Sequence, residues 1–198
     1  PHQAEPVAIC RLKRVAADHK EDVSNRMPKP APHNGRRVAC VGAGPASLTV
    51  ARDLATLGYE VTVFDGETKA GGFIRSQIPR FRLPESVIDE ECGYVFNLGV
   101  KFVSGSYIES MRQLLTQKFD AVFVGTGAPR GRDLPLPGRT EAGKAAHIGI
   151  DWLASVSFGH VQKVGKRVLV LGGGNTAMDC CRSAKRLGAQ EVKVVVRS

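Results

Sequence analysis

The sequence has 198 residues and only five cysteines, and no two of these are spaced as a metal-binding or redox-active pair. The absence of a C-x-x-C motif argues against a metal centre or an iron–sulfur cluster held by this chain. It also argues against an enzyme that passes electrons to a disulfide, because such enzymes need two neighbouring thiols. We expect three of the cysteines, which lie in apolar or helical runs, to be small core residues. These are Cys40, Cys180 and Cys181.

Long apolar runs and an N-terminal signal peptide are also missing from the sequence. No stretch approaches the roughly 20 apolar residues that cross a bilayer, so no contact with a membrane is indicated. The odd number of cysteines is typical of a reducing compartment. We therefore expect a soluble protein of the cytoplasm.

Aromatic residues make up only 6% of the chain and do not alternate with its basic residues. The net charge of +9 is concentrated at the two ends, since residues 1–37 carry +4, residues 38–160 carry −1 and residues 161–198 carry +6. Without interleaved aromatic residues, a helix-turn-helix or an RNP-like pattern, this charge does not indicate nucleic acid as a partner. Anionic cofactors and a surface for a protein partner account for it instead.

A glycine-rich fingerprint, residues 42–47, separates a predicted strand from a predicted helix. Val38–Val41 is a short apolar run, and Pro45–Gly58 has the apolar spacing of a helix that ends at its glycine. Glycines in such a turn let backbone amides approach a pyrophosphate at the positive end of the helix dipole. A second strand, residues 60–65, ends at Asp65, which can accept hydrogen bonds from ribose hydroxyls. The pattern predicts a dinucleotide site, and a plain turn between strand and helix is the alternative.

The same pattern occurs again near the end of the sequence. Residues 167–171 predict a strand, residues 172–174 are glycines, Asn175–Leu187 predicts a helix and residues 191–196 predict a second strand. Arg197 then stands where the first unit has its acid. A guanidinium suits the 2′-phosphate of NADPH, whereas a carboxylate repels it. The second unit therefore favours NADPH over NADH, unless Arg197 is only a solvated residue at a strand end.

Two dinucleotide-binding units in one chain imply electron transfer between two cofactors. We predict an α/β fold of two Rossmann-like βαβ units with parallel sheets, preceded by a short helical N-terminal segment. The second unit is incomplete, because the strands that would complete its sheet do not follow it. We therefore expect the sequence to be a fragment of a longer polypeptide.

The region between the two units also alternates between helices and strands. Helices are predicted near residues 85–98, 110–117 and 148–158, and strands at residues 101–103 and 120–124. The last of these strands is followed by Gly125-Thr126-Gly127. Small residues at the carboxyl end of a strand let the backbone approach a ligand that lies across the sheet. A simple tight turn explains the same three residues equally well.

Several segments together carry a resemblance to a known family. They are Val41–Ala46 with Asp65, Gly71-Gly72, Ile78–Pro84, Thr126-Gly127 and Gly172–Asp179. These residues resemble the glutamate synthase small-subunit family, whose members are FAD- and NADPH-dependent oxidoreductases related to dihydropyrimidine dehydrogenase and to formate dehydrogenase-associated subunits. The I-P-x-F-R-L-P stretch at residues 78–84 is the most specific part, and the resemblance covers essentially the whole sequence.

The resemblance implies that FAD and NADPH bind to the glycine-rich segments. The implied FAD-binding residues are Gly42, Gly44, Pro45 and Ala46 for the pyrophosphate, Asp65 for the adenosine ribose, Gly71 and Gly72 for the flavin side, and Thr126 and Gly127 for the approach across the sheet. The implied NADPH-binding residues are Gly172, Gly174, Asn175 and Thr176 for the pyrophosphate and Arg197 for the 2′-phosphate. No catalytic acid or base is implied, because the cofactors do the bond making.

The resemblance also implies a division of the chain into three parts. Residues 1–37, with a basic helix over residues 7–19 and a proline-rich linker, would be the end of an iron–sulfur domain. Residues 38–160 would be the first part of an FAD-binding domain, and residues 161–198 would begin an NADPH-binding domain. The family's 4Fe-4S clusters would be held by cysteines upstream of Pro1 and not by this chain.

The implied activity is transfer of hydride between NADPH and FAD, with electrons passed through iron–sulfur clusters to a larger oxidoreductase subunit of the glutamate synthase or formate dehydrogenase type. The alternative is a stand-alone, non-catalytic nucleotide-binding module that docks on a larger enzyme. Three residues depart from the family pattern, and one of them is Cys10, which replaces a glycine. Ser47 replaces the third glycine of the fingerprint, and Gln77 replaces the glycine before Ile78-Pro79.

Overall fold

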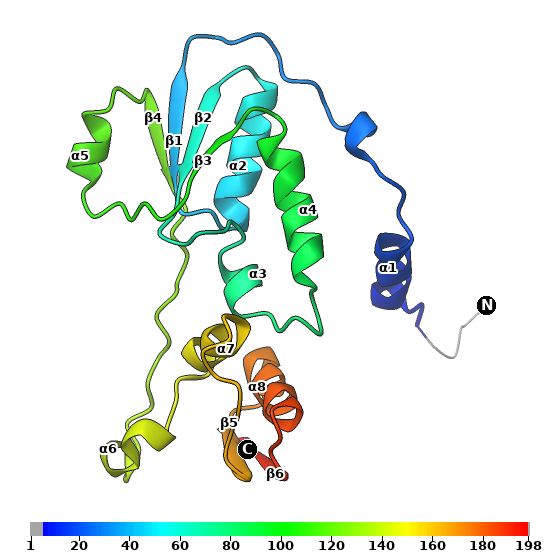
Figure 1. Cartoon of the computed structure of the whole chain (residues 1–198), viewed down its shortest axis with the longest axis vertical. Helices are drawn as coiled ribbons and strands as arrows, with labels where there is room; N and C mark the ends of the chain where they lie inside the picture. Colours follow the sequence, from blue (N-terminus) through cyan, green and yellow to red (C-terminus); the bar gives the residue numbers. More distant parts are fainter. Residues whose placement is uncertain (1–5, 198) are drawn as a thin grey trace.

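Two parallel sheets form the framework of the chain (Figure 1). The computed structural model describes residues 6–197. The larger sheet has the strand order β3-β2-β1-β4, and the smaller sheet pairs β5 with β6. All strand pairs are parallel. The strands are β1 (Arg37–Val41), β2 (Glu60–Phe64), β3 (Lys101–Val103), β4 (Ala121–Val124), β5 (Arg167–Leu171) and β6 (Glu191–Val195).

The helices connect these strands and cover both faces of the larger sheet. They are α1 (Ile9–Asp18), α2 (Pro45–Thr56), α3 (Phe73–Ser76), α4 (Glu85–Phe96), α5 (Met111–Leu115), α6 (Arg139–Ala142), α7 (Gly149–Ser157) and α8 (Asn175–Arg186). Two short 3₁₀ turns are η1 (Ser24–Arg26) and η2 (Gly143–Ala145). Helices α2 and α4 pack on one face of the larger sheet, and α5 packs on the other.

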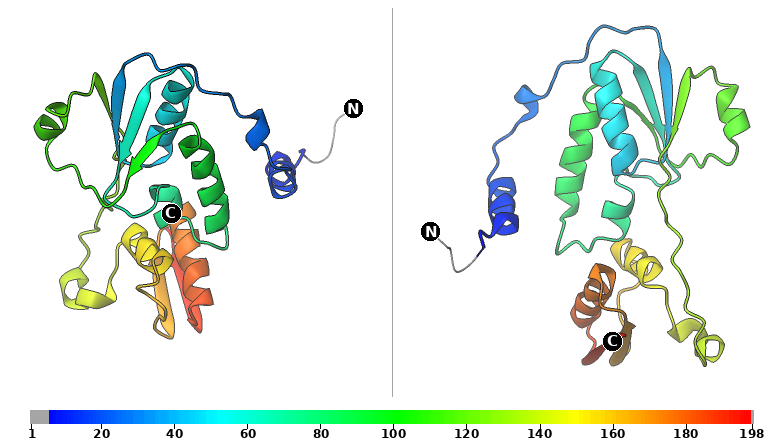
Figure 2. Two further views of the ribbon diagram at one scale, coloured as in Figure 1. Left: turned by 45° about the horizontal axis from the view of Figure 1, so that its top comes forward. Right: turned by 180° about the vertical axis from the view of Figure 1, so that it is seen from behind.

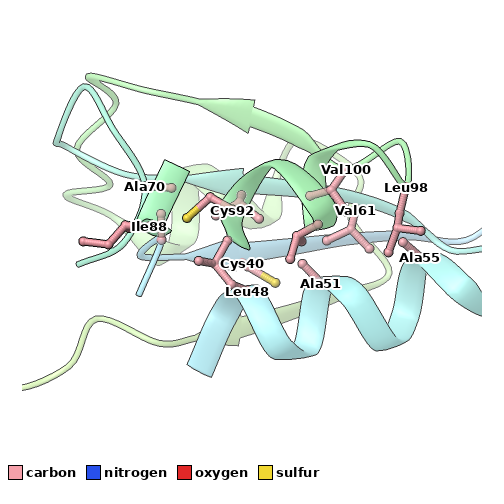
Figure 3. Close-up of a cluster of buried hydrophobic side chains, with 13 residues drawn as sticks. Cys40, Leu48, Ala51, Ala55, Val61, Ala70, Ile88, Cys92, Leu98 and Val100 are labelled. Atoms are coloured by element: carbon pink, nitrogen blue, oxygen red, sulfur yellow. The ribbon is translucent and has the colours of Figure 1, made fainter. Parts of the chain in front are cut away.

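The main core lies between the larger sheet and helices α2 and α4 (Figure 3). Strand β1 contributes to both faces, because successive side chains of a strand point in opposite directions. Cys40 therefore joins the cluster under α2, whereas Ala39 and Val41 face Leu114 of α5. Burial on both faces is typical of a central strand in a parallel sheet. This arrangement fixes where β1 ends and where its glycine-rich turn begins.

The second unit repeats the backbone hydrogen bonds of the first. The first glycine of each fingerprint donates its N–H to the last residue of the neighbouring strand, and the two bonds are Gly42 to Phe64 and Gly172 to Val195, both 2.8 Å. Gly44 and Gly174 then cap their helices with φ/ψ of −78°/175° and −80°/177°. The two βαβ units therefore have the same backbone geometry at their glycine-rich turns.

The two units meet where the chain leaves α3. Helix α3 contacts α7, and α7 in turn contacts α8. Arg82, which follows α3, forms an ion pair with Asp179 of α8 at 2.6 Å. Both views in Figure 2 show the second unit at the end of the first unit that carries α3.

The N-terminal helix α1 stands apart from both sheets (Figure 1) and buries none of its residues. Lys20, which follows it, pairs with Glu90 at 3.3 Å and Glu91 at 2.9 Å on α4. An extended, proline-rich connection then leads to β1. Among residues 6–197, no helix is long and apolar enough to cross a membrane.

The predicted α/β fold with parallel sheets is confirmed. Every strand and helix expected from the pattern is present, and no end differs by more than two residues. Helices α3 and α6 were not predicted, because a helix of four residues is too short to show apolar periodicity. The smaller sheet has two strands among the described residues.

Candidate functional site

A cleft of about 720 Å³ lies at the carboxyl ends of β1, β2 and β4. Strand β1 pairs with β2 on one side and with β4 on the other, so the direction of chain progression reverses at β1. At such a switch point the loops that follow neighbouring strands leave in opposite directions and open a crevice. This crevice is where α/β sheets bind their ligands.

Gly42 closes the turn after β1 with a φ of +92°, which a residue with a side chain rarely adopts. A Cβ on Gly42 would lie 2.5 Å from the carbonyl oxygen of Gly125, so the loop after β4 packs directly on this turn. Gly125 in turn donates its N–H to the carbonyl of Val41 at 2.8 Å. The packing of the protein itself therefore requires glycine at position 42.

Gly44 has a different role, because the space beside it is open. It is the N-cap of α2, no side chain caps the helix, and Pro45 takes the first helical position. The backbone amides that follow in the first turn therefore have no partner within the helix. A Cβ on Gly44 would meet nothing within 4 Å. Open space beside free amides, at the positive end of a 12-residue helix, suits an anion such as a pyrophosphate.

The loop that carries Gly71 and Gly72 lies against this fingerprint. Gly71 donates its N–H to the carbonyl of Ala43 at 2.9 Å. A Cβ on Gly72 would approach the Cα of Gly44 to 2.8 Å, and Gly72 has a φ of +51°. Two glycine-rich loops from different parts of the sequence therefore form one wall of the cleft.

Asp65 follows β2, and its carboxylate lies beside the fingerprint turn. Its Oδ2 accepts the N–H of Ala43 at 2.5 Å, and its Oδ1 accepts the N–H of Glu67 at 2.8 Å. Each carboxylate oxygen keeps a second lone pair, so Asp65 can accept further hydrogen bonds at the surface of the cleft. The hydroxyls of a ribose are donors of this kind.

The structure brings most of the predicted residues of the first site together. The cleft is lined by Gly42, Gly44, Pro45, Ala46, Asp65, Gly72, Thr126 and Gly127. Gly71 does not line it but holds the wall through its bond to Ala43. The remaining predicted residues lie in the second unit and do not line this cleft, and they are Gly172, Gly174, Asn175, Thr176 and Arg197.

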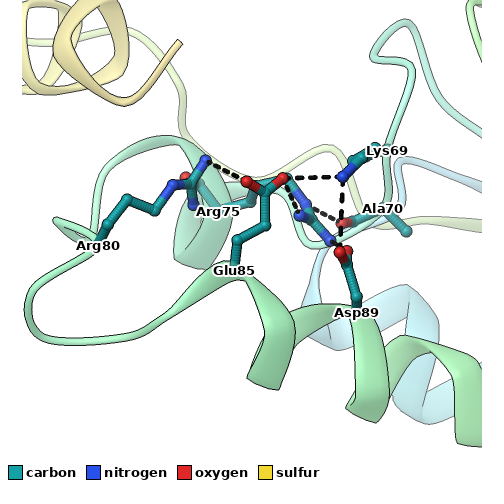
Figure 4. A network of polar contacts seen from close by, with 6 residues as sticks. All are labelled: Lys69, Ala70, Arg75, Arg80, Glu85 and Asp89. Atoms are coloured by element: carbon teal, nitrogen blue, oxygen red, sulfur yellow. Dashed lines mark hydrogen bonds and ion pairs between the residues drawn. The ribbon is translucent and has the colours of Figure 1, made fainter. Parts of the chain in front are cut away.

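Sequence reasoning missed an arginine that lines the cleft. Arg75 of α3 is only 4% exposed. Its guanidinium donates to the carbonyl of Ala70 at 2.6 Å, to Glu85 at 2.8 Å and to Asp89 at 2.6 Å (Figure 4). Lys69 also pairs with Glu85 at 3.0 Å. These contacts tie the second glycine-rich loop to α4.

This network also changes the acidity of its two carboxyl groups. The hydrogen bond from Arg75 lowers the pKa of Asp89, and the hydrogen bond from Lys69 lowers the pKa of Glu85. The ionised forms are favoured because charge-assisted hydrogen bonds stabilise them. No pattern in the sequence pairs these residues, since they come from a loop and two separate helices.

Two buried polar atoms have no hydrogen-bond partner among the described residues, and they are Oγ of Ser47 and Oε1 of Gln77. Both residues stand where the related family has glycine. Gln77 is 8% exposed and lines the cleft. A buried polar atom without a partner costs free energy unless a ligand or water satisfies it. The Oε1 of Gln77 is thus both unpaired and shielded from solvent, in a residue that lines the cleft.

In the second unit, the hydrogen-bond register places Val196 at the position of Asp65. Gly172 donates to Val195 as Gly42 donates to the residue before Asp65, so Arg197 comes one residue later than the acid it was matched with. Val196 packs on the turn, because a Cβ on Gly173 would approach its Cγ1 to 3.0 Å. Arg197 is exposed. An apolar residue at this position carries no charge that would repel a 2′-phosphate.

A protein-family model described as pyridine nucleotide-disulphide oxidoreductase matches residues 36–198, which include both fingerprints and the whole cleft. The chain belongs to this family. In this member of the family all five cysteines are free and lie within the described residues. Burial raises the pKa of the Cys40 and Cys180 thiols to about 11, so both are protonated core groups, as expected from the sequence. Cys181 is only half-buried, because it lies on the flank of α8.

Relatives of this family member are longer oxidoreductase subunits. The NADPH-Fe(3+) oxidoreductase subunit beta of Geobacter sulfurreducens is 38% identical over 98% of this chain and 30% of its own length. A dihydropyrimidine dehydrogenase subunit PreT homolog of Salmonella typhi, named as NAD-dependent, is 35% identical over 98% of this chain and 47% of its own length. The NADP(+)-dependent formate dehydrogenase subunit beta of Moorella thermoacetica is 34% identical over 98% of this chain and 31% of its own length. The chain therefore spans less than half the length of these relatives.

Solved structures of oxidoreductases share the fold. FprA from Mycobacterium tuberculosis in complex with NADPH has a TM-score of 0.63 at 22% identity, over 83% of this chain and 43% of that one. Thioredoxin reductase from Lactococcus lactis has a TM-score of 0.56 at 19% identity, over 82% of this chain and 56% of that one.

Proposed function

We propose that this chain is the nucleotide-binding part of a flavoprotein subunit that transfers hydride between NADPH and FAD and passes electrons through iron–sulfur clusters to a larger oxidoreductase subunit. The observation that carries the proposal is the pair of matching fingerprints, one of which opens on the 720 Å³ cleft. When bound, the two cofactors supply the chemistry, which is the exchange of a hydride between nicotinamide and flavin. The chain holds, orients and shields them.

The first site fits FAD because three of its features suit three parts of that molecule. The free amides of α2 and the open space at Gly44 suit the pyrophosphate, and the lone pairs of Asp65 suit the ribose. The side chain of Gln77 lines the cleft and suits a polar edge of the flavin, because its amide can both donate and accept hydrogen bonds. The residues proposed to hold FAD are Gly42, Gly44, Pro45, Ala46, Asp65, Gly71, Gly72, Thr126 and Gly127.

The second site fits NADPH for related reasons. Helix α8 has 12 residues and no side-chain cap, and a Cβ on Gly174 would meet nothing within 4 Å. Val196 and the exposed Arg197 favour the 2′-phosphate of NADPH over the free hydroxyl of NADH. Two of the relatives are named for NADPH or NADP(+), and one is named for NAD. The residues proposed to hold NADPH are Gly172, Gly174, Asn175, Thr176 and Arg197.

A larger partner subunit is proposed because the relatives are named as subunits. We also keep the division into residues 1–37, 38–160 and 161–198 as the end of an iron–sulfur domain, the first part of an FAD domain and the start of an NADPH domain. The free thiols agree with the reducing cytoplasm, which remains the proposed location.

The test is the visible spectrum of the purified protein and its change when NADPH is added without oxygen. We expect flavin bands that bleach on addition of one equivalent of NADPH, and that bleach more slowly with NADH. A protein that carries no flavin, and whose intrinsic fluorescence does not change on addition of FAD, would overturn the proposal. That result would favour a non-catalytic docking module.

A further inference from the structure

The segment between α3 and α4 reaches from the first unit to the second. Arg82 on this segment donates from Nη1 to Oδ2 of Asp179 at 2.6 Å. Asp179 is 5% exposed and lies in the helix that follows the second fingerprint. A buried carboxylate needs a charged or hydrogen-bonding partner, and here that partner comes from the other unit.

The residue before Arg82 makes a second contact with the same helix. The ring of Phe81 lies under two guanidinium groups of α8, 4.7 Å from that of Arg182 and 3.8 Å from that of Arg186. Such cation–π contacts are attractive within about 6 Å of the ring. Asp179, Arg182 and Arg186 are spaced by three and four residues, so they lie on one face of α8.

Besides these contacts, helix α3 packs on α7, and α7 packs on α8. A pocket of about 140 Å³ beside them is lined by Pro79 and Phe81 on one side and by Leu153 of α7 and Leu187 of α8 on the other. The contacts of Phe81 and Arg82 therefore add a charged and cation–π connection to the helix packing between the two units.

The same segment is also anchored to the first cleft. Arg80 donates from Nη1 to the carbonyl of Arg75 at 2.9 Å, and Arg75 is bonded to the loop that precedes Gly71. The contacts thus run without interruption from the loop before Gly71, through Arg75 and Arg80, to helix α8. We propose that Phe81, Arg82, Asp179, Arg182 and Arg186 form an inter-unit latch that positions the second nucleotide relative to the first.

The inference rests on the proposed function, since the latch is assigned a role in hydride transfer between the two cofactors. Arg82 and Asp179 are positioning residues, because they line neither glycine-rich turn and reach the cofactors only through the elements that carry them. Loss of the latch is therefore expected to slow hydride transfer, with the affinity for each nucleotide unchanged. A small misplacement of reacting groups costs about tenfold to a hundredfold in rate.

The experiment compares Arg82→Met, Asp179→Asn and the double variant in the purified protein. Anaerobic stopped-flow measures the limiting rate of flavin reduction by NADPH, and equilibrium titration measures the NADPH dissociation constant. We expect a rate loss of about tenfold in each single variant, no further loss in the double variant, and a dissociation constant within about twofold of wild type. Arg112→Met, an exposed arginine on α5, is the matched control and should behave as wild type.

Reduction of the flavin by dithionite distinguishes the latch from a general loss of structure. If the variants keep the wild-type flavin content, and the dithionite rate is unchanged while the NADPH rate falls, the latch is supported. Wild-type NADPH rates in both single variants would overturn it, and so would equal losses with both reductants. A wild-type protein that binds flavin but is not reduced by NADPH would instead overturn the proposed function.

Discussion

At the scale of single residues, the two glycines of the first fingerprint, Gly42 and Gly44, have different roles. Gly42 has a φ of +92° and no room for a Cβ, so its glycine is required by the fold. Gly44 has ordinary extended backbone, and the space that its Cβ would occupy is open, so the fold alone accepts a side chain there. A requirement for glycine at position 44 therefore points to a ligand.

We expect Gly44→Val to fold normally and to lose FAD. The valine methyl groups would fill the space beside the amides of α2, where the pyrophosphate is proposed to lie. The flavin content after gel filtration should fall below about a tenth of wild type, with little change in melting temperature. Gly174→Val is the matched control, because it fills the same position of the second fingerprint and should retain its flavin. An equally yellow Gly44→Val protein would show that the pyrophosphate lies elsewhere.

We expect Arg197→Asp to move the nucleotide preference from NADPH toward NADH. An aspartate at the end of β6 repels a 2′-phosphate and removes its guanidinium partner. The ratio of kcat/KM for NADPH to that for NADH should fall by about tenfold to a hundredfold. Lys193→Asp reverses a charge on the preceding strand, β6, and should leave the ratio unchanged. A constant ratio in Arg197→Asp would remove Arg197 from the site.

At the scale of elements, the network around Arg75 holds the short helix α3 and the loop before it onto α4. A helix of four residues is not stable by itself, so α3 depends on these contacts. Arg75 is buried, whereas the side chains of Glu85 and Asp89 are 40% and 48% exposed. The arginine therefore contributes more to the stability of this network than either carboxylate does.

We expect Arg75→Met to lower the free energy of unfolding by about 1–3 kcal/mol, less than a fully buried ion pair would contribute, because its partners remain half in water. The flavin affinity should fall with it, since Ala70 and the adjoining glycines lose their anchor. Chemical denaturation and FAD titration measure the two effects. Arg112→Met is again the control, and equal stability of the Arg75 and Arg112 variants would contradict the assignment.

The same network makes the free energy of unfolding depend on pH. Contacts in the folded state lower the pKa of Glu85 and of Asp89 below their ordinary values of 4.5 and 3.8. Their contribution is therefore complete above these ordinary values and is lost as the pH falls through the lowered ones. The melting temperature should drop below about pH 4.5, and the drop should be smaller in Arg75→Met, in which Asp89 has lost its main partner.

At the scale of the whole molecule, a large part of the positive charge belongs to the unit that is proposed to bind NADPH. Residues 161–198 carry +6, while residues 38–160 carry −1. A local excess of this sign raises the concentration of an anion near its site, and salt screens the effect.

We expect the KM for NADPH to rise by roughly tenfold between about 0.01 and 0.15 M ionic strength, while the limiting rate and the flavin content stay constant. Steady-state kinetics in a salt series measures this. A KM that does not change with salt would show that the charge of the second unit serves a different partner.

The sequence by itself determined every strand, every helix except α3 and α6, and both glycine-rich turns. Apolar periodicity and glycine are local signals, so strands such as β3 and β5 and the caps at Gly44 and Gly174 could be located from their own residues. The repeated spacing of strand, glycines and helix likewise indicated two nucleotide-binding units, because that pattern is set by the backbone geometry of one βαβ unit.

Only the tertiary structure decided which distant residues meet. It placed Gly72 against Gly44, buried Arg75 between Ala70 and α4, and joined Arg82 to Asp179 across 97 positions of the chain. It also showed that the residue of the second unit equivalent to Asp65 is Val196 and not Arg197, because hydrogen bonds set the strand register and residue counting does not. Such contacts arise when separate elements pack together, and no local pattern of residues records them.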